Sequence, residues 1–188
     1  MTNPVTRRHV LSGLSALALL AATPGPALAE LKRIPRDHGS TSRQIVRFDS
    51  AEKPGTIIIS NTERSLHVVL GNNQAARYDI SVGRDGFVWT GTTTVGRKAQ
   101  WPDWRPPAEM RQRDPSLPTF VPAGPYNPLG ARAIYLYSGG RDTLYRIHGT
   151  NSAETVGGFE TSGCFRLTNA DVIELFDKVA VGTKVIVK

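Results

Sequence analysis

The pattern that most constrains the fold of this chain is a series of short apolar runs separated by glycine and asparagine turns. Three such runs follow one another at spacings of about ten residues, which is typical of an antiparallel meander; they cover residues 57–60, 66–70 and 76–82. Further runs of this kind lie at residues 90–95, 133–137, 144–148 and 184–187. Because β-branched and alternating residues in runs this short favour strands, the sequence predicts a mostly β domain.

One segment has the periodicity of an amphipathic helix. Val172, Phe176 and Val179 recur at helical spacing, and a glycine follows them. Thr168 is suited to cap the first turn, in which Asp171 adds a favourable acidic residue. We therefore expect one main helix, shortly after the single cysteine of the chain.

The number of cysteines excludes a disulfide within the chain and a structural zinc site. A chain of 188 residues can bury a core without covalent cross-links, and its one cysteine, Cys164, has no partner within the chain. Structural zinc sites need several thiolates at short spacings, and the four histidines are scattered. The sequence thus predicts no disulfide, no metal site and no cofactor.

Residues 1–29 have the organisation of an export signal. Arg7 and Arg8 precede an apolar stretch over residues 10–22, and residues 27–29, Ala-Leu-Ala, form a small-residue cleavage site. The arginine pair resembles the twin-arginine signal, with a general secretory signal as the alternative. The apolar stretch is too short to span a bilayer comfortably, and no cysteine follows it for lipidation. We expect a cleaved signal, a periplasmic and wall-associated mature protein, and no stable membrane anchor.

The remaining chain divides into two parts. Residues 30–55 are polar and basic, which predicts a flexible leader ahead of one domain at residues 56–188. Cleavage of the signal removes two arginines and no acid, and leaves 21 Lys and Arg against 16 Asp and Glu, or +5. This moderate charge suggests an anionic envelope partner only weakly. Export and the absence of a recognised motif disfavour nucleic acid as a partner.

A segment rich in proline interrupts the β pattern at residues 98–131. Long loops in compact domains are usually functional or disordered, and Trp101 and Trp104 argue against disorder. We interpret this segment as a wall or lid beside a binding cleft, which these tryptophans and Trp89 are candidates to line. The alternative is a structural excursion whose tryptophans fill the core. The alternating tyrosines of the later strands are expected to pack rather than to contact substrate; they are Tyr135, Tyr137 and Tyr145.

Candidate catalytic residues gather between His148 and Arg166. A cysteine attacks a carbonyl only as thiolate and needs a base nearby, which a histidine supplies. Cys164 follows His148 by 16 residues and precedes the predicted helix. Backbone N–H groups around Gly163, near a helix N-terminus, are suited to hold an oxyanion. Arg166 adds a positive charge for a substrate carboxylate or for loop support.

These residues carry a resemblance to a known family. His148-Gly149-Thr150, followed after a glycine-containing gap by residues 162–167, Ser-Gly-Cys-Phe-Arg-Leu, resembles the active-site signature of the L,D-transpeptidases of the YkuD type. Residues 64–69 and 78–83 are similar to the family's first hairpin and to its strand ending in Val-Gly. The resemblance covers roughly residues 56–188 and points to an exported Gram-negative member. Many members have a histidine where this chain has Ser162, so no second histidine is expected at this site.

The resemblance implies a β-sandwich-like fold and a peptidoglycan L,D-transpeptidase. Cys164 would attack the bond between diaminopimelate and D-Ala in a tetrapeptide stem, with His148 as the base and the backbone of Ser162 and Gly163 at the oxyanion. Support of the substrate or of the surrounding loop would come from Arg166, Gly149 and Thr150. An amine of a second stem peptide or of an envelope protein would resolve the acyl-enzyme.

Other functions remain open at the level of sequence. The same Cys-His site would make an L,D-carboxypeptidase if water were the acceptor. A sortase also uses His, Cys and Arg, but separates its His and Cys by far more residues. A non-catalytic wall-binding module needs no Cys-His pair, and no wall-binding repeat is recognisable in the sequence.

Overall fold

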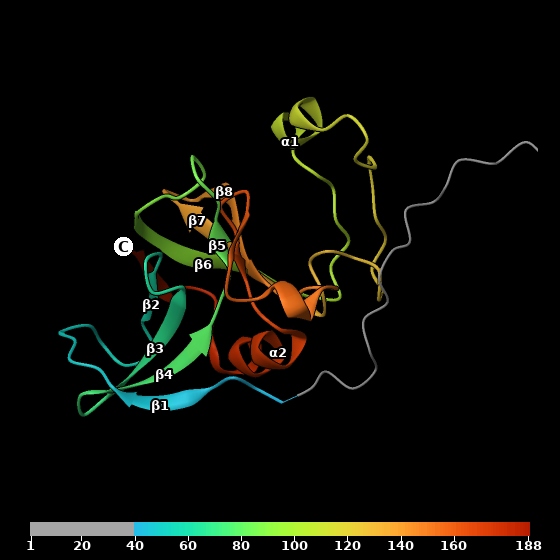
Figure 1. Cartoon of the computed structure of the whole chain (residues 1–188). Coiled ribbons are helices and arrows are strands. Elements are labelled where there is room, and N and C mark those ends of the chain that lie inside the picture. Colours follow the sequence, from blue (N-terminus) through green and yellow to red (C-terminus); the bar gives the residue numbers. More distant parts are fainter. Residues whose placement is uncertain (1–39) are drawn as a thin grey trace, which may run out of the picture. The chain divides into compact units, whose positions relative to one another are not determined.

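The computed structural model describes residues 40–188, and within this range β-strands dominate (Figure 1). The strands are β1 Gln44–Arg47, β2 Ile57–Ser60, β3 Ser65–Gly71, β4 Gln74–Asp79, β5 Val82–Gly83, β6 Gly91–Gln100, β7 Arg132–Ser138, β8 Arg141–His148, β9 Phe159–Thr161, β10 Phe165–Arg166 and β11 Lys184–Val187. The helices are α1 Ala108–Arg113, α2 Asn169–Lys178 and the short 3-10 helix η1 Ala153–Thr155. The predicted mostly β fold with one main helix is confirmed.

Nine strands form one sheet in the order β1-β4-β3-β2-β11-β6-β7-β8-β10, and β5 pairs with β9. The predicted antiparallel meander is present as β2, β3 and β4. The last strand, β11, lies inside the sheet, parallel to β2 and antiparallel to β6. The sheet therefore joins the N-terminal meander to the later strands through its C-terminal strand.

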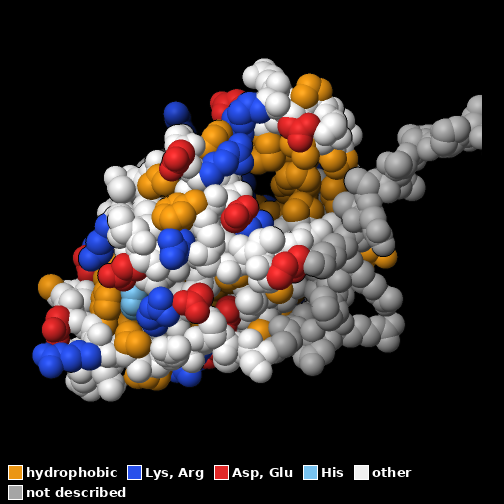
Figure 2. Space-filling view, in the orientation of Figure 1, with side chains coloured by type: hydrophobic (Ala, Val, Ile, Leu, Met, Phe, Trp, Pro, Cys, Tyr) orange, Lys and Arg blue, Asp and Glu red, His pale blue; other side chains and the backbone are white. Residues whose placement is uncertain are grey.

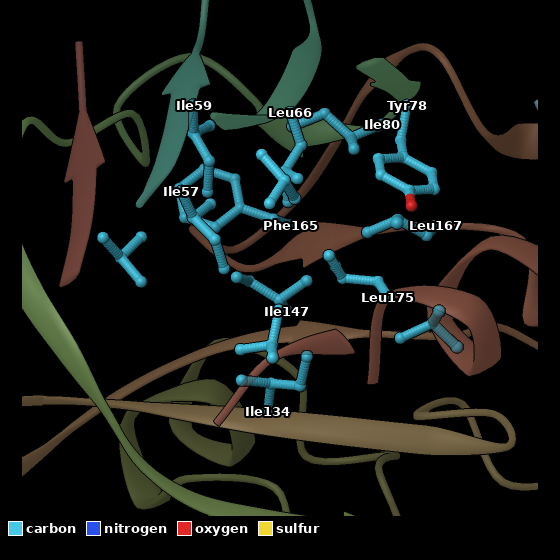
Figure 3. Close-up of a cluster of buried hydrophobic side chains, with 14 of the residues drawn as sticks. Ile57, Ile59, Leu66, Tyr78, Ile80, Ile134, Ile147, Phe165, Leu167 and Leu175 are labelled. Carbon is cyan, nitrogen blue, oxygen red and sulfur yellow. The ribbon is translucent and has the colours of Figure 1, made fainter. Parts of the chain in front are cut away.

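The core lies between the two halves of this sheet (Figure 3). Ile57, Ile59 and Leu66 from β2 and β3 lie on one side, and Ile134 and Ile147 from β7 and β8 lie on the other. Phe165 of β10 fills the space between them and is fully buried. Because the residue after Cys164 is anchored in this core, packing fixes the backbone that carries the thiol.

Helix α2 begins as the sequence predicts. Thr168 Oγ1 accepts a hydrogen bond from the backbone N–H of Asp171 at 3.1 Å. The apolar side of the helix packs into the core; it comprises Val172, Leu175 and Phe176. At the other end Lys98 of β6 donates to the carbonyls of Phe176 and Val179. A cation there satisfies carbonyls that have no helical partner, so Lys98 ties α2 to the sheet.

The part of the predicted flexible leader that the structure describes is instead attached to the domain. β1 pairs with β4 at the edge of the sheet. Thr41 Oγ1 and the Ser42 N–H donate to the carboxylate of Asp171 at 2.6 and 2.7 Å. Asp171 is fully buried, and a buried carboxylate needs polar donors. The polar residues that led to the prediction of a flexible leader thus include the donors to Asp171. The expected signal and the leader up to residue 39 lie outside the described residues.

Residues 101–131 connect β6 to β7 and hold α1 away from the sheet (Figure 1). A backbone bridge between Trp104 and Val121 closes this loop on itself. Asn127 is fully buried and donates to the carbonyls of Pro102, Val121 and Pro122. The loop is thereby shaped by its own polar contacts. None of the helices formed by residues 40–188 has the length and apolar character needed to cross a membrane.

Candidate active site

Cys164 lies at the end of a tight turn held by the side chain of Thr161. Thr161 Oγ1 donates to the carbonyl of Cys164 at 2.6 Å and accepts the N–H of Gly163 at 3.1 Å. Gly163 has a φ of +102°, and a Cβ at this position would lie 2.5 Å from the Tyr145 ring. Only glycine fits this conformation and this close approach.

Trp89 supports the same turn. Its Nε1 donates to the carbonyl of Gly163 at 2.9 Å, and its ring stacks on Tyr145 with centroids 4.5 Å apart. Contrary to the prediction, Trp89 is not among the residues that line the cleft described below. Its indole instead holds the backbone next to the thiol.

A cleft of about 610 Å³ opens on Cys164. The loop over residues 101–131 supplies one wall, including Trp104 and Met110, which agrees with the interpretation of this loop as a wall. The sheet side of the cleft includes Tyr135, Tyr145 and Ser162. Both tyrosines pack as predicted, Tyr145 against the Trp89 ring and Tyr135 beneath the Arg97 guanidinium, and both also line the cleft.

His148 is held in one tautomer by its own chain. It ends β8, is 7% exposed, and its Nδ1 lies 2.6 Å from the carbonyl oxygen of Gly149. A carbonyl only accepts, so Nδ1 carries the ring proton and Nε2 keeps its lone pair. The orienting group that the sequence could not identify is a backbone carbonyl. The Nε2 lone pair of this tautomer is the one that can accept a proton.

The register of the sheet brings His148 and Cys164 to the same face. β10 pairs parallel with β8, so that Arg166 lies opposite His148 and Phe165 opposite Ile147. Cys164 precedes Phe165 and is therefore a diagonal neighbour of His148. With strands about 4.8 Å apart and a rise of about 3.3 Å per residue, the two backbones are about 8 Å apart.

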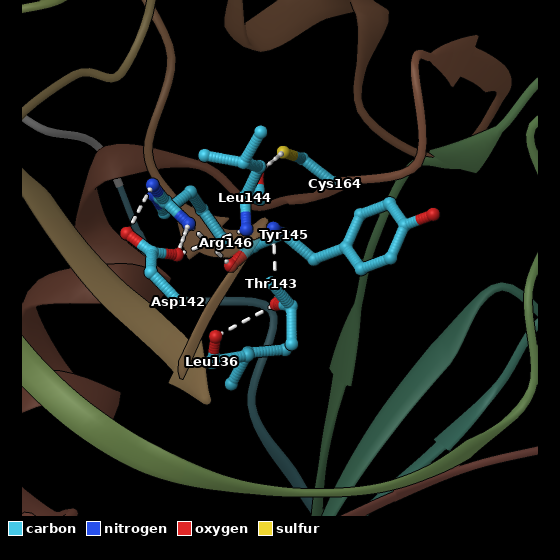
Figure 4. Close-up of polar contacts among 7 residues, drawn as sticks. All are labelled: Leu136, Asp142, Thr143, Leu144, Tyr145, Arg146 and Cys164. Atoms are coloured by element: carbon cyan, nitrogen blue, oxygen red, sulfur yellow. Dashed lines mark hydrogen bonds and ion pairs between the residues drawn. The ribbon is translucent and has the colours of Figure 1, made fainter. Parts of the chain in front are cut away.

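At rest the thiol contacts a backbone carbonyl (Figure 4). Cys164 Sγ lies 3.9 Å from the carbonyl oxygen of Leu144. The hydrogen bonds of residues 40–188 include none between this sulfur and the His148 ring. In this arrangement the thiol contacts the Leu144 carbonyl and not the His148 ring.

A bulge in β8 presents the Leu144 carbonyl. On β7, Tyr135 and Tyr137 are two residues apart, whereas their partners on β8, Arg146 and Asp142, are four apart. Leu144 lies within the bulge with a φ of +63°. The Asp142 carboxylate accepts the Leu144 N–H at 2.9 Å and binds the Arg146 guanidinium at 2.6 and 2.9 Å (Figure 4). Bulges often re-aim groups beside active sites, and this one aims a carbonyl at the sulfur.

Desolvation favours the uncharged forms of Cys164 and His148. Desolvation raises the pKa of Cys164, and the nearby N–H and guanidinium of Arg146 oppose this effect only in part. Desolvation also lowers the pKa of His148 from 6.5 to about 4, although the bond to the Gly149 carbonyl raises it. A thiol beside a neutral imidazole suits general-base activation better than a preformed ion pair.

The predicted support residues hold loops around His148. Arg166 donates to the carbonyl of Thr155 at 3.3 Å and does not line the cleft. The side chain of Asn169 accepts the N–H of Thr150 at 3.3 Å and donates to the Thr150 carbonyl at 2.7 Å. A Cβ on Gly149 would lie 2.2 Å from Asn169 Oδ1, so a glycine is required there. These contacts favour loop support over substrate contact.

The predicted oxyanion donors differ in availability. The Gly163 N–H is already bonded to Thr161, as described above. Within residues 40–188 the N–H of Cys164 has no hydrogen-bond acceptor. Ser162 lines the cleft. The backbone N–H of Cys164 is thus the donor best placed to meet an oxyanion. The described residues contain no group of three His, Cys, Asp or Glu side chains arranged to hold a metal ion.

Comparison with known proteins was made at the level of sequence and of structure. The family model of the YkuD L,D-transpeptidase catalytic domain matches residues 54–187. The chain is 39% identical to the probable L,D-transpeptidase ErfK/SrfK of Escherichia coli over 151 residues. This match covers 76% of the chain and 46% of that protein, so the chain spans about half the length of this relative. A putative L,D-transpeptidase of Fuscovulum blasticum is 31% identical over 98% of both chains.

Solved structures have the same fold. L,D-transpeptidase 3 of Mycobacterium tuberculosis superposes with a TM-score of 0.54 at 16% identity, and covers 71% of this chain and 60% of that one. A Brucella melitensis structure described as a probable carnitine operon oxidoreductase is 43% identical. It has a TM-score of 0.53 and covers 78% of this chain and 92% of that one.

Proposed function

The chain belongs to the YkuD family of L,D-transpeptidase catalytic domains, and we propose that it transfers acyl groups of peptidoglycan stem peptides through a cysteine acyl-enzyme. The observation that carries this proposal is the placement of Cys164 in an open cleft on the same sheet face as His148, whose Nδ1 is bound to the Gly149 carbonyl.

The first half-reaction forms a thioester. Nε2 of His148 takes the proton of the Cys164 thiol, and the sulfur attacks the carbonyl between diaminopimelate and D-Ala of a tetrapeptide stem. The backbone N–H of Cys164 donates to the oxyanion. When the carbon–nitrogen bond breaks, His148 returns its proton to the departing D-Ala amine.

The second half-reaction resolves the thioester. An acceptor amine attacks the same carbonyl, His148 removes its proton, and the Cys164 thiol is regenerated. With the amine of a second stem peptide, the product is a 3-3 crosslink; with an amine of an envelope protein, the protein becomes attached to the wall. Water in place of the amine would make the protein an L,D-carboxypeptidase.

The proposal includes the cellular location of the protein and the roles of its segments. Residues 1–29 direct export to the periplasm, and the domain from residue 56 onward, with the attached β1, works there. Peptidoglycan is the partner in that compartment.

Incubation of the purified protein with tetrapeptide-stem muropeptides tests the proposal. Mass spectrometry should show release of D-Ala together with 3-3 crosslinked products, and Cys164→Ala should abolish both. Release without crosslinks would identify the carboxypeptidase, and activity that survives Cys164→Ala would contradict the mechanism.

A second readout needs no acceptor. A carbapenem should acylate Cys164 and raise the intact mass of the protein by the mass of the drug. Cys164→Ser removes the thiol with little change in size, so its mass should stay constant under the same exposure.

A further inference from the structure

The cleft beside Cys164 carries more positive than negative side chains. Four arginines and two acids line it; they are Arg97, Arg105, Arg113, Arg146, Asp103 and Glu109. Figure 2 shows Lys and Arg side chains between α1 and the sheet, beside a hollow with hydrophobic walls. A ligand that carries carboxylates fits such a cleft better than a neutral or cationic one.

Two of these arginines belong to a row that crosses the sheet towards the nucleophile. Arg97 on β6 lies opposite Tyr135 on β7, and Tyr135 lies opposite Arg146 on β8. Continuing the β8–β10 register by one residue places Cys164 opposite Arg146. Arg97 and Cys164 therefore stand three strand spacings apart on one face, about 14 Å between backbones.

A second bulge turns Arg97 onto this face. Val95 pairs with the buried Leu136, and the next pair along the ladder is Arg97 with Tyr135, so that Gly96 is the extra residue. Without the bulge, Val95 and Arg97 would point to the same side of the sheet. A Cβ at Gly96 would lie 2.2 Å from the Tyr137 ring, so the position suits glycine. The bulge thus directs the Arg97 guanidinium to the cleft instead of the core.

The two arginines of the row differ in whether a carboxylate of the protein pairs with them. The guanidinium of Arg146 is neutralised by Asp142 at 2.6 and 2.9 Å. That of Arg97 lies over the Tyr135 ring, 3.5 Å from its centroid, and no carboxylate among residues 40–188 forms an ion pair with it. A guanidinium whose face rests on a ring keeps its N–H edges free for a carboxylate.

We propose that Arg97, resting on Tyr135, binds a carboxylate of the donor stem peptide that lies away from the scissile bond. The assignment rests on the proposed function, since it takes the stem peptide as the donor. The stem offers two such groups, the side-chain carboxylate of diaminopimelate and the α-carboxylate of the γ-linked glutamate. Arg97 is a substrate-binding residue in this scheme and takes no part in proton transfer.

Donors amidated at one carboxylate test this assignment. Three tetrapeptide stems are compared: one unmodified, one amidated on diaminopimelate and one amidated on the glutamate. Wild-type protein should lose about tenfold to a hundredfold in kcat/KM on one of the two amidated donors, as expected for a charge-assisted hydrogen bond. Arg97→Gln should lose a similar factor on the unmodified donor and no longer distinguish it from that amidated donor.

Arg105→Gln is the matched control. Arg105 lines the same cleft and also rests on an aromatic ring, that of Phe120, but it lies on the loop outside the row. This variant should keep the wild-type preference for the unmodified donor. A preference kept by Arg97→Gln, or three donors used equally by wild-type protein, would overturn the assignment.

Failure of the proposed function gives a different result. In that case no donor releases D-Ala with wild-type protein. Binding of the three stems to Cys164→Ala, measured by calorimetry, then tests the subsite alone. Tighter binding of the unmodified stem that Arg97→Gln removes supports the assignment, and equal binding of all three overturns it.

Discussion

Acidification should destabilise the domain through His148. Its pKa is about 4 in the folded chain, against an ordinary value of 6.5, because burial disfavours the imidazolium. As the pH falls below 6.5, the unfolded chain takes up this proton before the folded one does. The contribution of His148 to stability is therefore complete above pH 6.5 and is lost as the pH falls towards 4. Linkage with these two values gives a loss of about 2 kcal/mol between pH 7 and pH 5.

The measurement compares two variants that differ only at this position. Burial also lowers the pKa of His67, so this second buried histidine is first replaced in a His67→Gln background. Urea unfolding followed by tryptophan fluorescence then gives the free energy of unfolding of His67→Gln and of His67→Gln/His148→Gln at pH 7, 6 and 5. The first should lose about 2 kcal/mol more than the second over this range.

The comparison uses the change with pH and not the absolute stability, because the glutamine itself alters packing. Equal losses in the two variants would refute the reasoning, since they would mean that His148 titrates alike in the folded and unfolded chains. A larger loss in the double variant would also refute it, since it would mean that the pKa of His148 is raised, not lowered, in the folded chain.

Three further substitutions test contacts around the site. Gly149→Ala should cost about 1–3 kcal/mol of unfolding free energy, because its Cβ would displace the Asn169 amide, and urea unfolding measures this. Asp171→Ala should cost about 2–4 kcal/mol in the same assay, since it leaves the donors of the N-terminal segment without their buried acceptor; a loss below 1 kcal/mol would count against this. Asp142→Asn should speed alkylation of Cys164 by iodoacetamide at pH 8 roughly twofold to fivefold, because the Asp142 charge raises the pKa of the thiol; slower alkylation would contradict this.

The elements that the sequence predicts well are those with local causes. Helix α2 has its cap, its apolar spacing and its final glycine within one short segment, and each strand of the meander has its own turn. β1 was missed because its stability comes from an edge pairing and from Asp171, which lies 129 residues after Ser42. No local pattern reports such a contact.

In the candidate site, too, the sequence predicts residues with a local signal and misses those that depend on long-range pairing. Cys164 and His148 could be predicted because a cysteine nucleophile needs a nearby base, and histidine is the usual one. The row formed by Arg97 and Tyr135 was missed because it depends on cross-strand register. Counting back from the Gly139-Gly140 turn would pair Tyr135 with Leu144, whereas the bulge in β8 pairs it with Arg146. The Gly96 bulge changes the face of Arg97 in the same manner. Gly96, directly after the predicted run over residues 90–95, is a sequence signal that could have raised this possibility for β6, whereas the bulged part of β8 contains no glycine.

The interior position of β11 has a consequence for how the chain folds. β2 and β6 do not pair with each other, and each completes its ladder only with residues 184–187. Val185 pairs with Ile57, so this contact closes a loop of more than a hundred residues. Such non-local pairing slows folding, because the entropy of loop closure is lost before the contact stabilises the chain. During synthesis the N-terminal meander emerges long before β11, so the sheet cannot be completed until residues 184–187 have been made.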